Sequence, residues 1–364
     1  MKAVKVGVLA ITVLGACAIL ASPGVTRNNS TGPYVEKAIH WLVSVQGHDG
    51  GWGQDGGETS YVRTGEHLES NGNDVANSAV AILALVHAGH TPVSGEYRSQ
   101  VRRGVDFILR SVENSAETGL AVTSVSGTQI QRKLGPYIDT FLTSTLLSEL
   151  DGNMGDTQSN QRVRRALEKV VRKIEANQQS DGSWNIAGGW APILGTSMAS
   201  RSLDVAARKG VRVDTDAMKK VDEYTKQAQA GAAAPASAGV ALYQNAQALE
   251  QLSRTERDRE TNAKEIRAIT GQLADARFVN GFGSMGGEEF FSYLNISDSL
   301  HRAGGEPWNK WNNQIKTQLV RLQNDDGTWA GHHCITGRVA VTSAAVMTLL
   351  AENDPVAVSS VKRK

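Results

Sequence analysis

A seven-residue pattern, Gln-x-x-Asp-Gly-x-Trp, occurs three times in this chain, at residues 46–52, 178–184 and 323–329. Tryptophan occurs only 7 times among the 364 residues, so three matches at four fixed positions indicate a true repeat. A repeated unit buries its apolar face against its neighbours, which makes the chain an array of similar units. The fixed polar and aromatic positions are Gln46, Asp49, Trp52, Gln178, Asp181, Trp184, Gln323, Asp326 and Trp329.

The segments around the repeats alternate between two kinds of helix. At residues 163–174 the apolar side chains recur every three or four positions, and Arg and Lys fill the other face, which predicts a helix with one exposed side. The helices at residues 75–86 and 339–350 are apolar or small nearly all round, so they must be buried on every side. The same pairing recurs without the signature at residues 101–112 with 139–150, 218–227 with 238–252, and 265–275 with 290–300.

This alternation predicts an all-α fold of six helical hairpins. Six inner helices ringed by six outer helices form an (α/α)6 toroid, which we place at residues 33–352. Residues 353–364 then form a C-terminal tail.

Each residue type in the repeat has a structural use. Asp-Gly forms a tight turn, because glycine readily takes the left-handed conformation that such a turn requires. Glutamine satisfies backbone groups at a helix end, and tryptophan packs a large surface into the seam between neighbouring units. We therefore expect these residues to brace the fold rather than to catalyse a reaction.

The N-terminal segment has the pattern of a targeting sequence. Lys2 and Lys5 precede an apolar run at residues 6–21, which is short for a membrane-spanning helix. Residues 1–21 are predicted to be a secretory signal or, because Cys17 lies in a lipobox-like context, a lipoprotein signal. An uncleaved anchor is the third alternative. With residues 22–32 as a polar linker, we expect a secreted, periplasmic or envelope protein that meets the membrane only through the N-terminal segment. The lipoprotein alternative would make it lipid-anchored.

Composition argues against nucleic-acid binding and against a cysteine-rich fold. Lys plus Arg number 38 and Asp plus Glu number 37, so the net charge of +1 gives no field that would gather nucleic acid. Only two cysteines are present, so neither a disulfide framework nor a cysteine-rich zinc module is expected.

The repeat resembles the QW repeat of squalene-hopene cyclases and oxidosqualene cyclases, and the repeats of protein prenyltransferase beta subunits, which share the terpenoid-cyclase toroid. The family's chemistry does not carry over with it. Cyclases of this family use an Asp-x-Asp-Asp motif, whereas the nearest strings here are residues 214–217 (Asp-Thr-Asp-Ala) and 324–326 (Asn-Asp-Asp). The prenyltransferase zinc site needs Asp-x-Cys and a distant histidine, but His332 precedes Cys334 and Val341 stands near the histidine position.

The turns leading into the inner helices surround one mouth of a toroid, so functional residues are expected there. The longest of these turns are residues 53–74 and 119–138, and long loops are often functional. The candidate binding residues at this mouth are His67, Asp74, Arg132, Lys133, Tyr137, Glu288, His332, Cys334 and Arg338, and the candidate catalytic residues are Asp139, Glu289 and His333.

Some of these candidates have both a functional and a structural interpretation. In the functional one, Arg132 and Lys133 hold an anion, with Tyr137 or Asp139 as acid or base. In the structural one, Asp74 and Asp139 cap the helices that they open.

The densest group of metal-binding residue types is residues 332–334, His-His-Cys. Three adjacent side chains cannot all bind one ion, so a metal site there would need Glu288, Asp74 or His67 from across the mouth. Our prediction is therefore no metal and no cofactor.

Three functions remain open. The first is a protein that binds a hydrophobic or isoprenoid ligand, a glycan or a protein partner outside the cytoplasm. The second is a divergent isoprenoid (squalene or prenyl) cyclase or transferase. The third is a secreted polysaccharide lyase, which would be favoured by an open groove lined by Trp190, Trp308 or Trp311.

Overall fold

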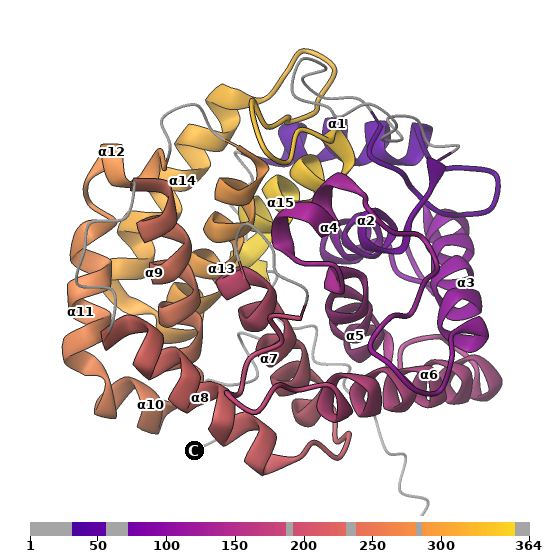
Figure 1. The fold of residues 1–364 in the computed structure, drawn as a ribbon. Helices are drawn as coiled ribbons and strands as arrows, with labels where there is room; N and C mark the ends of the chain where they lie inside the picture. The colour runs from indigo at the N-terminus through magenta and orange to yellow at the C-terminus, as the bar shows by residue number, and fades with distance from the viewer. Residues whose placement is uncertain (1–30, 56–71, 187–191, 231–237, 282–285, 354–364) are drawn as a thin grey trace, which may run out of the picture. The chain divides into compact units, whose positions relative to one another are not determined.

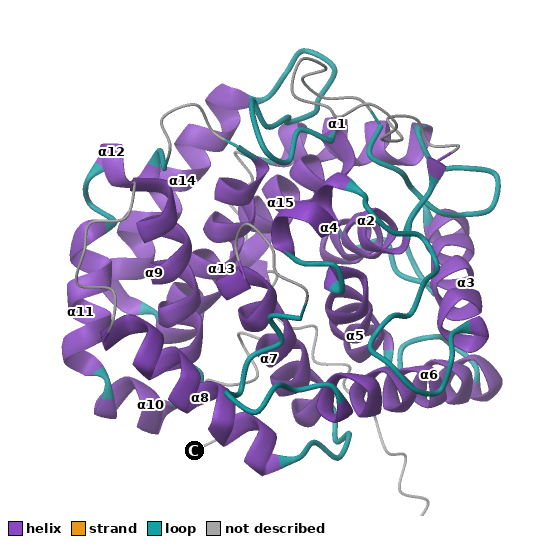
Figure 2. Ribbon diagram, viewed as in Figure 1, coloured by secondary structure: helices purple, strands orange, loops and turns teal. Residues whose placement is uncertain are grey.

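The computed structural model describes residues 31–55, 72–186, 192–230, 238–281 and 286–353, and these lie in one compact unit that begins at Thr31. Within these ranges every regular element is a helix, and the only β-type contact is an isolated bridge between Trp52 and Asp74 (Figure 2). None of the helices in these ranges has the length and apolarity that crossing a membrane requires. The all-α prediction is confirmed.

Six inner helices form a closed ring, because each packs against the next and the last packs against the first (Figure 1). In ring order they are α2 (Val75–His87), α5 (Ile138–Leu150), α7 (Pro192–Arg208), α9 (Ala238–Leu252), α13 (Gly287–Ala303) and α15 (Arg338–Leu350). The principal outer helices are α1 (Gly32–Ser44), α3 (Arg98–Asn114), α6 (Thr157–Ala176), α8 (Thr215–Ala230), α11 (Ala263–Gln272) and α14 (Gly305–Leu322). The chain alternates outer and inner helices, which confirms the (α/α)6 toroid.

Burial follows the predicted pattern. In α13 every residue from Gly287 to Leu300 is buried, whereas α6 buries one face, including Val163, Leu167 and Ile174. An inner helix contacts both ring neighbours and an outer helix, so it has no wet side.

Short additional helices depart from the simple hairpin scheme. The predicted loop 119–138 contains α4 (Gln129–Leu134), which a capping box between Thr128 and Gln131 initiates. The fifth outer segment is divided into α10 (Glu256–Thr261), α11 and α12 (Ala276–Val279), and a 3-10 turn at Ala351–Asn353 follows α15. Sequence periodicity missed α4, α10, α12 and the 3-10 turn because helices of three to six residues are too short to show a repeat.

The tryptophan of each repeat makes the same contacts. The indole Nε1 donates to a carbonyl ten residues earlier in the preceding outer helix, as in Trp329 to Leu319 O at 2.8 Å. Its backbone N–H donates to a hydroxyl on the following inner helix, as in Trp329 to Thr342 Oγ1 at 3.0 Å. Trp52 and Trp184 repeat both bonds, so each tryptophan joins the two helices of one hairpin.

The glutamine of each repeat joins one hairpin to the next. Gln46 Nε2 donates to Gly50 O in its own turn and to Gln100 O at the start of α3. Gln323 makes the corresponding bonds, the second of them to Tyr34 O of α1 at 2.8 Å, and so closes the ring between the last and first hairpins. Gln178 follows the same scheme with Gly182 and Ala217 of α8.

The turn of each repeat allows these close approaches. Asp49, Asp181 and Asp326 each accept a backbone N–H two residues later, and the following glycine has a φ near +90°. A Cβ at Gly182 would lie 2.3 Å from the carbonyl oxygen of Lys220, so only glycine fits against the next outer helix.

Candidate functional site at the mouth of the ring

Three segments that precede inner helices are joined by a buried glutamine of α4. Gln129 Oε1 accepts the backbone N–H groups of Thr336 and Gly337 at 2.7 and 3.2 Å, in the segment that leads into α15. The backbone N–H of Gln129 donates to Gln54 Oε1, in the segment that leads into α2. This end of the ring, where the inner helices begin, is the mouth that the sequence pointed to.

Two buried carboxyl groups lie together at the start of α2. Asp74 caps α2, accepting from the backbone N–H and side-chain amide of Asn77, both at 2.8 Å. Asp139 does not cap its own helix, which corrects the capping interpretation. It lies in the first turn of α5 and reaches across to accept from Ala76 N at 3.1 Å and from Gln131 Nε2 at 2.7 Å. Both carboxylates therefore stabilise the same helix terminus.

Burial, and for Asp139 also the neighbouring charge of Asp74, shifts the ionisation of these carboxyl groups. Burial raises the pKa of Asp74 to about 6. Burial, together with the charge of Asp74, raises the pKa of Asp139 to about 7. Near neutral pH the two carboxyl groups are therefore only partly ionised.

A pH dependence of stability follows from this pair. Both carboxyls titrate near 3.8 when unperturbed, so between that value and about 7 the folded protein binds more protons than the unfolded chain. The free energy of unfolding therefore falls as the pH rises through this window. We expect Asp139→Asn to reduce the loss of unfolding free energy between about pH 5 and about pH 8 by on the order of 2 kcal/mol, measured by urea titration at each pH.

Asp156→Asn is the control, because Asp156 accepts from a helix N-terminus, that of α6, but its hydrogen bonds to Ser159 lower its pKa. An equal change in both variants would contradict the interpretation.

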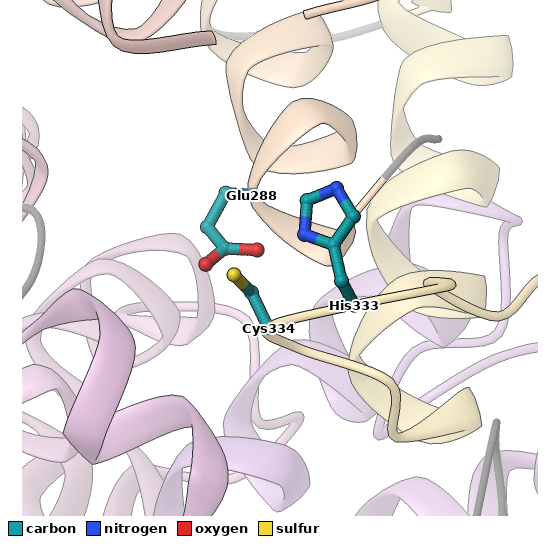
Figure 3. A group of neighbouring side chains, drawn as sticks. All are labelled: Glu288, His333 and Cys334. Carbon is teal, nitrogen blue, oxygen red and sulfur yellow. The ribbon is translucent and has the colours of Figure 1, made fainter. Parts of the chain in front are cut away.

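A second cluster joins the start of α13 to the segment before α15. The ligand-type atoms of Glu288, His333 and Cys334 all lie within 4.8 Å of one another. Figure 3 shows the Glu288 carboxylate and the Cys334 thiol facing each other, with the imidazole of His333 beside them. Glu288 is fully buried, and its Oε1 has no hydrogen-bond partner among the described residues. The sequence analysis named Glu288, Asp74 and His67 as additional metal ligands for residues 332–334, and the structure places Glu288 beside them.

The backbone around this cluster is specialised. Cys334 has a φ of +62°, and with Asp55 it is one of two non-glycine residues with positive φ in the described ranges. Such backbone costs free energy and is enriched at functional sites. A Cβ on Gly286 would lie 2.6 Å from Cε1 of His333 and 2.9 Å from a Glu288 oxygen, so glycine makes room for both side chains.

Further polar groups surround the cluster. Burial raises the pKa of Glu288, and burial together with the Glu288 charge raises the pKa of Cys334 to about 11. Burial and then the charge of Lys133 lower the pKa of His333. Burial and the charges of Glu289 and Glu288 raise the pKa of the Tyr243 hydroxyl on α9. Without a bound cation, the thiol of Cys334 is therefore protonated and is not an activated nucleophile.

The remaining mouth candidates fall into several groups. Arg338 donates to Asp55 O and Asp326 Oδ2 and lies over the ring of Trp41, so it supports the fold. Arg132 and His332 are exposed. His67, Trp190 and Cys17 lie outside the described residues.

The tryptophan groove expected of a lyase does not form from the described residues. Trp308 and Trp311 of α14 are buried, and Trp311 Nε1 donates to Ser297 Oγ of α13 at 2.8 Å. These two side chains join an outer helix to an inner one, so they are not available to a sugar.

A cleft of about 550 Å³ lies beside the loop between α3 and α4, with Tyr137 on its wall. Its other lining residues come from residues 111–124 and include no charged side chain, while Ser, Thr and Asn supply hydroxyl and amide groups. Lys169 Nζ donates to Ser115 O, and Lys173 Nζ to Ala116 O, which fixes one rim of the cleft.

The interior of the ring carries a buried network of charges. Arg201 of α7 donates to Asn295 and Asp298 of α13, although α9 separates these helices in the ring. Glu250 of α9 pairs with Arg254 at 2.8 Å, and Arg302 of α13 lies 3.8 Å from Glu250. This part of the interior is polar.

Sequence reasoning missed Tyr243 and this charge network. Tyr243 lies in the second turn of α9, and only a search of the first two turns of all six inner helices would have singled it out. Arg201 with Asp298, and Arg302 with Glu250, pair between helices that are distant in the chain, which leaves no periodic signal.

Comparison with known proteins supports the repeat assignment. Residues 9–127 match the family model of the squalene-hopene cyclase C-terminal domain. The chain is similar to a squalene–hopene cyclase of Bradyrhizobium diazoefficiens, at 30% identity over 97 residues, which covers 27% of this chain and 14% of that protein. It is also similar to a probable squalene–hopene cyclase of Sinorhizobium fredii, at 30% identity over 108 residues, covering 30% of this chain and 15% of the other. The matched part spans about one seventh of the length of these relatives.

These matches confirm the predicted resemblance to squalene-hopene cyclases, which they show for residues 9–127. Among solved structures, the chain is similar to an inactive variant of an alpha-1,6-mannanase from a Salegentibacter species in complex with alpha-1,6-mannotriose. The TM-score is 0.59 at 8% identity, and the match covers 88% of this chain and 98% of that chain. This likeness shows a shared helical toroid fold.

Proposed function

We propose that this toroid binds an uncharged glycan outside the cytoplasm, in the cleft beside Tyr137. The observation that carries the proposal is the lining of the cleft, in which hydroxyl and amide groups and one aromatic ring occur without a charged side chain. Sugars present hydroxyl groups and apolar C–H faces, and a half-buried tyrosine offers an apolar ring for the latter. A volume of about 550 Å³ is in the range of ligand pockets.

The rigidity of the cleft supports binding. Lys169 and Lys173 hold the carbonyls of residues 115 and 116, and Ser111 Oγ donates to Val122 O on the facing side. A site ordered before the ligand arrives loses less conformational entropy on binding.

An isoprenoid ligand is less consistent with the described interior. A hydrocarbon needs an apolar cavity, whereas Arg201, Glu250 and Arg302 place charged groups inside the ring. The proposal therefore departs from the activity named for the sequence relatives. The ligand of the mannanase with the similar fold makes alpha-1,6-mannotriose the first probe.

A binding assay with one variant tests the proposal. Calorimetric titration with uncharged oligosaccharides, beginning with alpha-1,6-mannotriose, is expected to show saturable binding. Tyr137→Ala should weaken it about tenfold, because loss of a ring contact costs roughly 1.5 kcal/mol. Tyr97→Ala is the control, since Tyr97 contacts His90 and does not line the cleft. Reducing-end release in the same samples reports any hydrolysis.

Two results would contradict the proposal. One is the absence of binding across uncharged oligosaccharides when the protein is folded. The other is equal affinity in the wild type and Tyr137→Ala.

A further inference from the structure

We propose that Glu288, His333 and Cys334 bind a single divalent metal ion, of which zinc fits the three ligand types best. The inference does not depend on the glycan proposed above, because the trio and the cleft share no residue. It revises the expectation from sequence that the chain binds no metal.

The donor set fits zinc. Carboxylate oxygen, imidazole nitrogen and thiolate sulfur all bind zinc at about 2.0 to 2.3 Å, which places ligands of a tetrahedral site about 3.5 Å apart. The three donor atoms already lie within 4.8 Å of one another, so movement of about an ångström would complete the site. Oxygen-preferring ions such as magnesium and calcium are disfavoured by the sulfur and nitrogen donors.

The buried carboxylate points independently to a cation. Glu288 is fully buried at the first turn of α13, and its Oε1 has no hydrogen-bond partner among the described residues. A buried carboxylate oxygen without a partner is costly, and coordination to a metal removes that cost. Lys133 also interacts with Glu288, but it leaves this oxygen without a hydrogen bond.

The backbone conformation positions the thiol of Cys334 and leaves room for the imidazole of His333. Cys334 holds its side chain toward Glu288 from a left-handed backbone conformation that glycine would adopt more easily (Figure 3). At Gly286, any Cβ would collide with the imidazole of His333 and with Glu288. Strained backbone and a required glycine at the same three side chains indicate that their arrangement has a use.

Three protein ligands leave a fourth position open. Structural zinc sites usually have four protein ligands, whereas sites with three keep a position for water or a ligand. Lys133 interacts electrostatically with all three members of the trio, so an anion at the fourth position would have a cation nearby. We therefore infer a site that holds an exchangeable anionic or water ligand.

Cobalt substitution tests the site directly. Full-length protein stripped with a chelator and titrated with Co²⁺ is expected to bind one ion and to develop a thiolate-to-cobalt charge-transfer band with the visible bands of a tetrahedral ion. Zn²⁺ should displace the cobalt and raise the melting temperature. Absence of the charge-transfer band in folded wild-type protein would overturn the proposal.

Matched variants assign the ligands. Cys334→Ser should abolish the charge-transfer band, and Glu288→Gln and His333→Asn should each weaken binding by about 100-fold or more, beyond the loss typical of an outer-shell partner. His332→Asn and Cys17→Ser are controls, since His332 is exposed and Cys17 is the only other cysteine. Circular dichroism confirms folding of each variant. A band that survives Cys334→Ser, or an equal loss in His332→Asn and His333→Asn, would also overturn the assignment.

Discussion

Trp329→Ala is expected to destabilise the protein by about 3 to 5 kcal/mol. The indole is fully buried and donates through Nε1 to Leu319 O of α14, while the backbone N–H bonds to Thr342 of α15. Removing the ring leaves a cavity between these two helices and an orphaned carbonyl on Leu319. Chemical denaturation followed by circular dichroism measures the free energy of unfolding.

Trp329→Phe separates packing from hydrogen bonding. It retains most of the buried ring but removes the N–H donor, so we expect a loss of about 1 to 3 kcal/mol. The same pair of substitutions at Trp52 should give similar values, because Trp52 donates to Leu42 O at 2.7 Å in an equivalent environment. Tolerance of alanine at either position, with an unchanged free energy of unfolding, would show that these residues do not brace the ring.

The toroid could be predicted because its determinants are local and repeated. Each Gln-x-x-Asp-Gly-x-Trp segment specifies its own turn, and the alternation of one-sided and fully apolar helices specifies which helix lies inside. Ring closure was inferred from the six alternating hairpins, whereas the bond from Gln323 to Tyr34 O that joins the last hairpin to the first could only be seen in the structure.

The candidate site could be predicted only in part. The mouth was the expected place, and Glu288, His333, Cys334 and Lys133 do converge there. Sequence did not reveal which of three acidic or histidine partners would join residues 332–334, because that choice depends on which inner helices are neighbours. Tyr243 was missed because it lies on α9 within an Ala- and Gln-rich segment that carries no other sign of function.

The burial of the interior charge network had no sequence signal, and this network gives the second large expected effect. Glu250→Gln is expected to cost about 3 to 5 kcal/mol, because it leaves buried arginines without their nearest carboxylate. Arg254 donates to Glu250 through Nε and Nη2, at 3.2 and 2.8 Å, and both side chains are at least 94% buried. Although burial opposes ionisation, the charges of Arg254 and Arg302 hold the pKa of Glu250 below its usual value, so the carboxylate is charged in the folded protein.

The control for Glu250→Gln is Glu306→Gln on α14. Glu306 pairs with Lys310 at the same spacing of four residues and the same 2.8 Å, but both side chains are 77% exposed. Water solvates either exposed partner once the other is removed, so no measurable change in unfolding free energy is expected. The two pairs thus share sequence spacing and distance and differ in burial. A small effect at both positions would show that the interior arginines find other partners, such as Asp298 or Asp222, when Glu250 is neutralised.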